Sequence, residues 1–336
     1  MEAFSAQTND AGETFHRPRQ AAVTTTARLH FGFLDPSGRG TRPFGSFGLS
    51  LDRPSTRLRL KRAEASAVNG PESERAARYL QCIAASCGVA QDYDLRIEQA
   101  IPPHAGLGSG TQLALAVGSA FAALEGLNLT PQDIAARLGR GARSGLGIVT
   151  FAQGGVVLDG GPRPGALPQL ISRLPFPSAW RVLLIFDAET TGVAGASEMA
   201  AFETLPDFPE SETDELYRRI AQSALPALEA GDFANFCVQV GYLQTCMGAY
   251  FAPLQGGPYT SPSVTAALDW LRAEGITGLG QSSWGPTGFA FVATAKDGQA
   301  LLDRLRSRFP HPGLSFTLAH GRNDGAIIET ASREMQ

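Results

Sequence analysis

Residues 101–118, IPPHAGLGSGTQLALAVG, place two prolines and three closely spaced glycines directly before a helix-compatible run. The prolines end the alternating segment before them, and the glycines permit backbone angles and close approaches that a side chain would block. The first-turn N–H groups of the following helix then point into the glycine loop, with the positive end of the helix dipole behind them. Such a loop is suited to hold an anion, and an ordinary strand-to-helix turn is the alternative that this stretch alone leaves open.

The composition is that of a folded protein without an obvious macromolecular partner. The 336 residues are 43% hydrophobic and 18% charged, which suffices for one or two domains. The net charge of −4 gives no global attraction to nucleic acid or to an anionic membrane. The four cysteines lack the paired C-x-x-C spacing of a zinc site. All basic residues except Lys61 and Lys296 are arginines, whose planar groups suit phosphate and carboxylate.

Apolar periodicity predicts an α+β protein with strands and helices mixed in both halves of the chain. Alternating or continuous apolar runs indicate strands at 21–30, 55–63, 93–100, 154–161, 180–188 and 314–320. Helix-type spacing and capping residues indicate helices at 72–87, 111–124, 130–140, 196–204, 212–229, 232–250, 261–274 and 296–308.

The proline-rich stretch 162–177 is the predicted domain boundary. We expect a flexible tail at 1–20, an N-terminal domain with the phosphate loop at 21–165, and a C-terminal α+β domain at 166–336. The start of the chain has no apolar core flanked by basic residues, and no apolar run reaches membrane-spanning length. We therefore expect a cytoplasmic protein that binds neither membrane nor nucleic acid.

Four glycine-marked polar segments interrupt the apolar pattern. They are residues 34–48 with Asp35 and Arg42, residues 101–111, residues 139–147 with Arg140 and Arg143, and residues 278–288. Because loops on a rigid scaffold carry most binding groups, four such loops predict a composite site for a phosphorylated ligand.

Each candidate side chain also has a structural interpretation. Asp35 precedes a proline and can start a turn, and the two arginines of 139–147 can cap a helix C-terminus. His30 and His104 can be hydrogen-bonded structural histidines, and His104 is the better functional candidate because it lies in the glycine loop. Trp284 is either a core residue or a ring that stacks on a flat ligand.

These motifs together resemble the GHMP kinase superfamily. GLGS at 106–109 resembles its central phosphate-loop motif, and GQSSWGPTG at 280–288 lies where its members carry a third, glycine-rich motif. The resemblance to one branch of this superfamily rests also on three further runs, ARLHFGFLDPSG (27–38), RSGLG (143–147) and GGVVLDGG (154–161). The chain resembles the beta-ribofuranosylaminobenzene 5′-phosphate synthases more than the kinases, over about residues 21–325.

The resemblance implies a two-domain GHMP-kinase-like fold with mixed sheets, in which the phosphate loop opens a helix. It implies a reaction in which 4-aminobenzoate, or a close aromatic analogue, attacks the anomeric carbon of phosphoribosyl pyrophosphate through a ring carbon. CO₂ and pyrophosphate leave, and the product enters tetrahydromethanopterin biosynthesis. It also implies Mg²⁺ as cofactor and a homodimer. The leaving pyrophosphate needs positive charge and backbone N–H groups, and the developing oxocarbenium needs negative charge nearby.

The resemblance assigns roles to particular residues. Asp35 and Arg42 are the predicted catalytic residues, Asp35 as a Mg²⁺ ligand or oxocarbenium stabiliser and Arg42 as a phosphate clamp. The predicted phosphate-binding residues are Gly106, Leu107, Gly108, Ser109, Gly110, Thr111 and Arg143. The predicted substrate-binding residues are His30, His104, Ser282, Ser283 and Trp284, of which the last three hold the aromatic ring.

Departures from the kinase pattern favour the synthase. The kinase motif continues G-L-G-S-S, where the second serine resembles a Mg²⁺-ATP ligand, and Gly110 takes that place here. No kinase-type catalytic aspartate with a partner lysine can be picked out, since the chain has two lysines. The alternatives are an ATP-dependent kinase of a small alcohol and a non-catalytic sensor of a phosphorylated metabolite.

Overall fold

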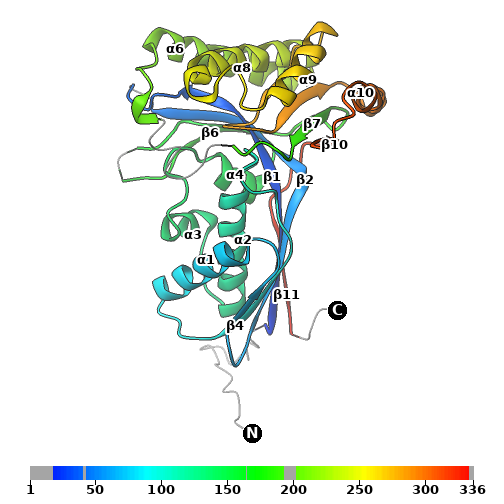
Figure 1. The fold of residues 1–336 in the computed structure, drawn as a ribbon. Coiled ribbons are helices and arrows are strands. Elements are labelled where there is room, and N and C mark those ends of the chain that lie inside the picture. Colours follow the sequence, from blue (N-terminus) through cyan, green and yellow to red (C-terminus); the bar gives the residue numbers. More distant parts are fainter. Residues whose placement is uncertain (1–17, 41–42, 164, 193–201, 333–336) are drawn as a thin grey trace.

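Two long neighbouring strands, β1 (Gln20–Asp35) and β2 (Phe44–Arg62), run the length of the molecule (Figure 1). The computed structural model describes residues 18–40, 43–163, 165–192 and 202–332. β1 and β2 pair antiparallel, with register shifts near residues 26–28 and 30–32. Since both strands extend into each half of the molecule, they connect the phosphate loop to the helices at the other end.

The strands form one seven-stranded and one four-stranded sheet. The larger sheet has the order β11-β1-β2-β4-β3, and β5 pairs with both β2 and β6. Its further strands are β3 (Ala67–Asn69), β4 (Tyr93–Gln99), β5 (Val156–Asp159), β6 (Leu170–Leu174) and β11 (Ile327–Ala331). The smaller sheet comprises β10 (Leu314–Ala319), β7 (Arg181–Asp187), β9 (Gly288–Val292) and β8 (Leu279–Gln281), in that order. The pair β3–β4 is parallel and the other pairs are antiparallel, so the predicted α+β class with mixed sheets is confirmed.

Helices cover both parts of this framework (Figure 1). In the N-terminal part they are α1 (Ser73–Ser86), α2 (Ser109–Glu125), α3 (Pro131–Arg137) and α4 (Leu146–Gln153). In the C-terminal part they are α6 (Glu210–Arg219), α7 (Leu225–Ala230), α8 (Phe233–Gln255), α9 (Pro262–Ala273) and α10 (Ala295–Arg308). Within the described ranges, no helix is long and apolar enough to cross a membrane.

Among the described residues, four apolar clusters fill the space between these layers, and the smallest consists of Leu146, Val149 and Val157. One packs α1 and α2 on the large sheet, around residues such as Leu95 and Phe121. Another packs α9 and α10 on the small sheet. The largest lies between β1, β2, α8 and β9 and is rich in phenylalanine; Phe31 contacts Phe47 at a ring-centroid distance of 5.3 Å and Phe289 at 5.5 Å. Aromatic rings therefore join the two parts of the molecule through the upper half of β1.

The structure differs from the sequence expectations at several elements. Within the polar segment 34–48, Leu34 and Asp35 belong to β1 and residues 44–48 belong to β2, so both ends of this segment lie in paired strands. The predicted helix at 212–229 contains a π-helical turn, η1 (Ile220–Ala224), since Pro226 has no N–H for a regular helical bond. The glycine-rich stretch 275–293 holds β8 and β9. Most of the helix predicted at 196–204 lies outside the described residues.

The division into domains at 165/166 and the flexibility of residues 1–20 stay predictions. β6 and β11 follow residue 165 in the sequence, yet both pair within the large sheet. β1 begins at Gln20, and residues 1–17 lie outside the described part of the chain.

A substitution at Gly118 can test the close approach of α2 to α3. A Cβ added there would lie 2.2 Å from Cγ2 of Ile134. We predict that Gly118→Ala lowers the free energy of unfolding by about 1–2 kcal/mol, because overpacking outweighs the gain in helix propensity. Urea unfolding measures the loss. The same substitution in an Ile134→Ala background should cost much less; an equal loss in both backgrounds contradicts the close approach.

Candidate functional site

The glycine loop is held between β1 and the turn that follows β8. The carbonyl oxygen of Gly106 accepts hydrogen bonds from Arg28 Nη1 at 2.6 Å and from Ser282 Oγ at 2.7 Å. Gly106 has φ +73°, and a Cβ there would lie 2.1 Å from the carbonyl oxygen of Ser282. Only glycine fits this left-handed, close-packed position, so three segments distant in sequence meet at one residue.

The first turn of α2 faces this loop. Its N-cap residue is Gly108, with φ 79°, and none of the described side chains caps the helix there. The helix follows the glycine loop directly and begins at Ser109, before the start at residue 111 that the sequence predicts. Its first turn therefore offers backbone N–H groups and the positive end of the helix dipole to an anion.

Three arginines from separate elements surround this helix terminus. The Cβ position of Gly110 lies 3.4 Å from Arg140 Nη2 and 3.6 Å from Arg75 Nη1, and that of Gly108 lies 3.1 Å from Arg28 Nε. Arg75 is also paired with Glu72, at 3.1 Å. Sequence reasoning did not select Arg28 or Arg75, since Arg28 lies on a strand and Arg75 on a helix. Arg140 is one of the two arginines that the sequence indicates as helix caps or binding residues. Its Nη2 donates to Thr111 Oγ1, in the first turn of α2, at 3.3 Å.

His104 lies at the exposed edge of this arginine group. Its Nε2 is 3.5 Å from Arg75 Nη2, and its carbonyl oxygen accepts a hydrogen bond from the Gly192 N–H at 3.0 Å. His104 in the glycine loop therefore lies beside Arg75. Its contact with substrate stays a prediction.

Aromatic rings form a wall next to the loop. Trp284 is 4% exposed and packs on Phe251 and Phe202, at centroid distances of 4.5 and 5.5 Å. Phe202 also contacts Phe33, at 5.9 Å. The guanidinium of Arg143 lies over the Phe202 ring at 5.0 Å. Trp284 is therefore a core residue and forms part of this aromatic wall, and its contact with substrate stays a prediction.

Ser282 and Ser283 hold β1 against this turn. Ser282 Oγ accepts a hydrogen bond from the His30 N–H at 3.0 Å while it donates to Gly106. The Ser283 N–H donates to the His30 carbonyl oxygen at 3.1 Å, and Ser283 has φ 55°. The Ser282 hydroxyl is thus engaged by the protein itself, and contact of either serine with substrate stays a prediction.

His30 is buried between the arginine group and the aromatic wall. Its ring meets Phe33 edge-on at 4.6 Å, and neither ring nitrogen has a hydrogen-bond partner among the described residues. Burial holds the pKa of His30 well below the ordinary 6.5, and the nearby charges of Arg28 and Arg143 lower it further. The imidazole is therefore neutral at physiological pH.

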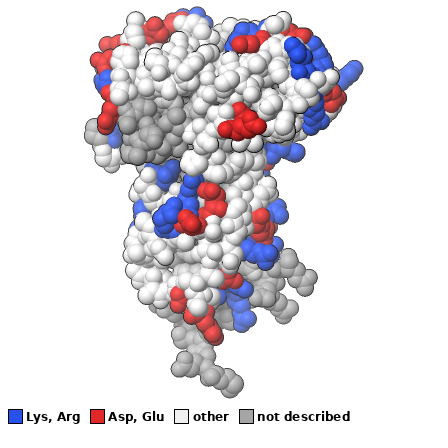
Figure 2. All heavy atoms as spheres, in the orientation of Figure 1, with Lys and Arg blue, Asp and Glu red and all other residues white. Residues whose placement is uncertain are grey.

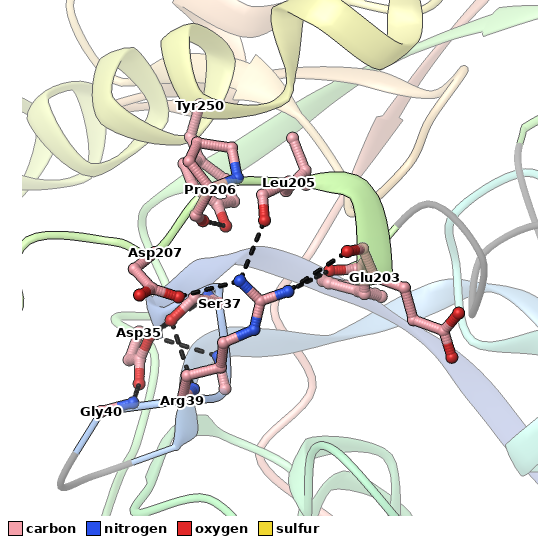
Figure 3. A network of polar contacts seen from close by, with 11 residues as sticks. Asp35, Ser37, Arg39, Gly40, Glu203, Leu205, Pro206, Asp207 and Tyr250 are labelled. Atoms are coloured by element: carbon pink, nitrogen blue, oxygen red, sulfur yellow. Dashed lines mark hydrogen bonds and ion pairs between the residues drawn. The ribbon is translucent and has the colours of Figure 1, made fainter.

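Asp35 shapes the turn between β1 and β2 (Figure 3). Its Oδ1 accepts from the Ser37 N–H at 3.1 Å, Ser37 Oγ at 2.6 Å and the Gly38 N–H at 3.2 Å. Its Oδ2 accepts from the Gly40 N–H at 2.9 Å. Only 1% of Asp35 is exposed. The turn-forming interpretation of Asp35 thus has direct support, while a catalytic or metal-binding role stays a prediction.

Arg39 ties that turn to the segment before α6 (Figure 3). Its guanidinium donates to the Leu205 carbonyl at 3.1 Å and pairs with Asp207 at 2.8 Å. Arg42, the predicted phosphate clamp, lies outside the described residues. In the part of the chain that the structure describes, no group of three or more His, Cys, Asp or Glu could hold a metal ion.

Asp159 fixes the loop that carries Arg143. It is fully buried and accepts hydrogen bonds from Ser46 Oγ, from Ser144 Oγ at 3.2 Å and from the Gly145 N–H at 3.1 Å. Burial raises the pKa of Asp159 despite these donors. Sequence reasoning missed this residue because it lies in an apolar strand segment.

The titration of His30 gives a stability test. Its folded pKa lies well below the ordinary 6.5, so the unfolded state binds more protons between these two values. We predict that the free energy of unfolding falls as the pH drops below about 7, by up to about 1.4 kcal/mol per pH unit. Urea unfolding across this range should show that His30→Leu removes this component. An unchanged pH slope in the variant contradicts the buried neutral imidazole.

Comparison with known proteins identifies the family. Residues 73–155 match the GHMP kinases N terminal domain, and residues 224–311 match the GHMP kinases C terminal domain. The beta-ribofuranosylphenol 5′-phosphate synthase of Archaeoglobus fulgidus is 30% identical, covering 91% of this chain and 99% of that protein. The protein of the same name from Methanothermobacter thermautotrophicus is 26% identical, covering 91% and 98%.

Solved structures show the same fold in proteins of other names. A homoserine kinase from Cytophaga hutchinsonii aligns with a TM-score of 0.67 at 15% identity, covering 94% of this chain and 99% of its own. A mevalonate diphosphate decarboxylase from Enterococcus faecalis aligns with a TM-score of 0.63 at 17% identity, covering 93% and 99%. These likenesses concern the fold alone, whereas the sequence relatives share nearly the full chain. The chain belongs to the beta-ribofuranosylphenol 5′-phosphate synthase family of the GHMP kinase superfamily.

Proposed function

We propose that this protein transfers a phosphoribosyl group from phosphoribosyl pyrophosphate to a para-substituted benzoate, with loss of pyrophosphate and CO₂. The observation that carries the proposal is the group of three arginines around the uncapped first turn of α2, next to an aromatic wall. The relatives are named for a ribofuranosylphenol product, which corresponds to 4-hydroxybenzoate. The aminobenzene product implied by the sequence resemblance corresponds to 4-aminobenzoate, which differs only in the para group.

The arginine group suits the leaving pyrophosphate. Breaking the bond between the anomeric carbon and pyrophosphate leaves negative charge on the departing oxygen. Arg28, Arg75 and Arg140 and the N–H groups of α2 are fixed before the reaction, so they stabilise that charge without reorganisation. Arg28 is held by its bond to the Gly106 carbonyl, which keeps its charge beside the loop.

The described residues do not form a protein cage for Mg²⁺. Mg²⁺ prefers six oxygen ligands and is commonly bound by one or two carboxylates together with substrate phosphates. Asp35 is the predicted carboxylate, and four donors from its own turn already engage it. We therefore propose that Mg²⁺ arrives with the pyrophosphate group of the substrate.

The aromatic wall suits the acceptor ring. In the proposed transfer, the ring carbon bonds to the anomeric carbon as the bond to pyrophosphate breaks. The bond from that ring carbon to CO₂ then breaks, and its electrons return to the ring, so neither ATP nor an oxidant is needed. Rings such as Trp284 and Phe202 can hold the acceptor in place. Strong pairing of the carboxylate with an arginine would oppose the departure of CO₂.

An assay without ATP tests the proposed function. Purified protein is incubated with Mg²⁺, phosphoribosyl pyrophosphate and carboxyl-labelled 4-aminobenzoate or 4-hydroxybenzoate. We predict that CO₂ and pyrophosphate are released in equal amounts with at least one acceptor, and that ATP adds nothing. ATP consumption in the presence of a small alcohol, without CO₂ release, contradicts the proposal and favours a kinase. Ligand-induced thermal stabilisation without turnover favours a sensor.

Arg140→Gln tests the role of the arginine group. We predict that this variant loses a charge-assisted hydrogen bond to phosphoribosyl pyrophosphate. The loss should raise KM for phosphoribosyl pyrophosphate by roughly tenfold to a hundredfold. We expect little change in Tm, because the hydrogen bond from the Arg140 guanidinium to Thr111 Oγ1 is long, at 3.3 Å. The matched control is Arg304→Gln, since Arg304 pairs with Glu274 and stacks on Trp270 in another part of the fold. Equal kinetic effects of the two substitutions would remove Arg140 from the site.

The family resemblance supports further proposals about the cellular setting. We propose a cytoplasmic homodimer whose product enters tetrahydromethanopterin biosynthesis. Light scattering on the purified protein measures the oligomeric state, and a monomer at working concentrations contradicts that part.

A further inference from the structure

His30 is a buried polar side chain whose ring makes no hydrogen bond to the described protein. It is 3% exposed, and both Nδ1 and Nε2 lack a partner among the described residues. Buried polar side-chain atoms nearly always have a partner, and leaving one without costs about 1–3 kcal/mol. The backbone of His30 is fully used, because its N–H donates to Ser282 and its carbonyl accepts from Ser283. The fold thus fixes an unpaired imidazole in place.

The surroundings keep this imidazole neutral. Arg28 lies two residues earlier on β1, and Arg143 approaches from the loop before α4. Phe33 covers one edge of the ring. Burial and the charges of these two arginines all lower the pKa of His30. A neutral imidazole has one hydrogen-bond donor and one acceptor, which suits a group that can both give and receive a hydrogen bond.

The space beside His30 matches a small polar group. His30, Phe33, Phe251, Ser283 and Trp284 help to line a cavity of about 30 Å³. This volume takes a group the size of a water molecule, so it admits an amino or hydroxyl substituent but no aromatic ring. A carboxylate fits the chemistry less well, because the nearby arginines would pair with it and oppose the loss of CO₂.

We propose that His30 hydrogen-bonds the amino or hydroxyl group para to the acceptor carboxylate, and so selects acceptors that carry such a group. This inference rests on the proposed function and adds the residue that recognises the acceptor. The acceptor nitrogen of the imidazole receives the substituent N–H or O–H. That bond increases electron donation from the substituent into the ring, toward the carbon that attacks the sugar. The cavity holds the substituent, and the acceptor ring lies outside it beside Phe202, which packs on Trp284 but is not among the residues that line the cavity.

The test compares two ligands of similar shape. Calorimetry with Mg²⁺ and inorganic pyrophosphate present measures the binding of 4-aminobenzoate and of 4-methylbenzoate, which lacks the polar group. We expect wild-type protein to prefer 4-aminobenzoate by roughly tenfold to a hundredfold, since an unmatched polar group is left when the methyl analogue binds. His30→Leu should bind the two ligands about equally. The exposed His320 gives the control, and His320→Leu should keep the wild-type preference.

A stability measurement separates recognition from a structural role. Because His30→Leu removes a buried unpaired polar group, we expect the ligand-free variant to have a Tm equal to or above that of wild type. If His30→Leu does not fold, His30→Gln replaces it, and the preference should fall severalfold. A folded variant that retains the full preference overturns this inference and leaves the proposed function intact. A wild-type protein that binds neither benzoate overturns both.

Discussion

The carbonyl oxygen of Gly106 is the point on which the site depends. Arg28 from β1 and Ser282 from the turn after β8 both donate a hydrogen bond to this oxygen. The Ser282 hydroxyl also accepts a hydrogen bond from the N–H of His30. These bonds join the two parts of the molecule at the glycine loop. The position of the helix terminus, of an arginine and of the imidazole is therefore set by one junction, before any ligand binds.

Charge and burial divide the site into two regions. Near α2, arginines and backbone N–H groups gather around a surface open to an anion. Near Trp284, aromatic rings pack together and leave the small cavity beside His30. Outside the site, Figure 2 shows basic and acidic side chains interspersed on the visible face, beside broad uncharged areas. The three arginines at α2 thus gather positive charge at one point of the fold, in keeping with the proposed binding of a small anion.

Local sequence signals predicted the parts of the structure that depend on near neighbours. The glycine loop, the presence of a helix directly after it and most other helices follow from local composition and periodicity. The likeness to GHMP kinases rested on such local runs and is confirmed. Arg28 and Arg75 could not be selected, because their relation to the loop arises only when β1 and α1 pack beside it. The engagement of Asp35 by its own turn was one of two open interpretations, and only the folded turn gives its partners.

The most direct measurement is a calorimetric titration of the purified protein with phosphoribosyl pyrophosphate, with and without a saturating non-hydrolysable ATP analogue. We predict that phosphoribosyl pyrophosphate binds in the presence of Mg²⁺ and that the ATP analogue leaves its affinity unchanged. Tight binding of the ATP analogue, with no heat from phosphoribosyl pyrophosphate, would overturn the proposed function and assign the arginine group at α2 to a nucleotide.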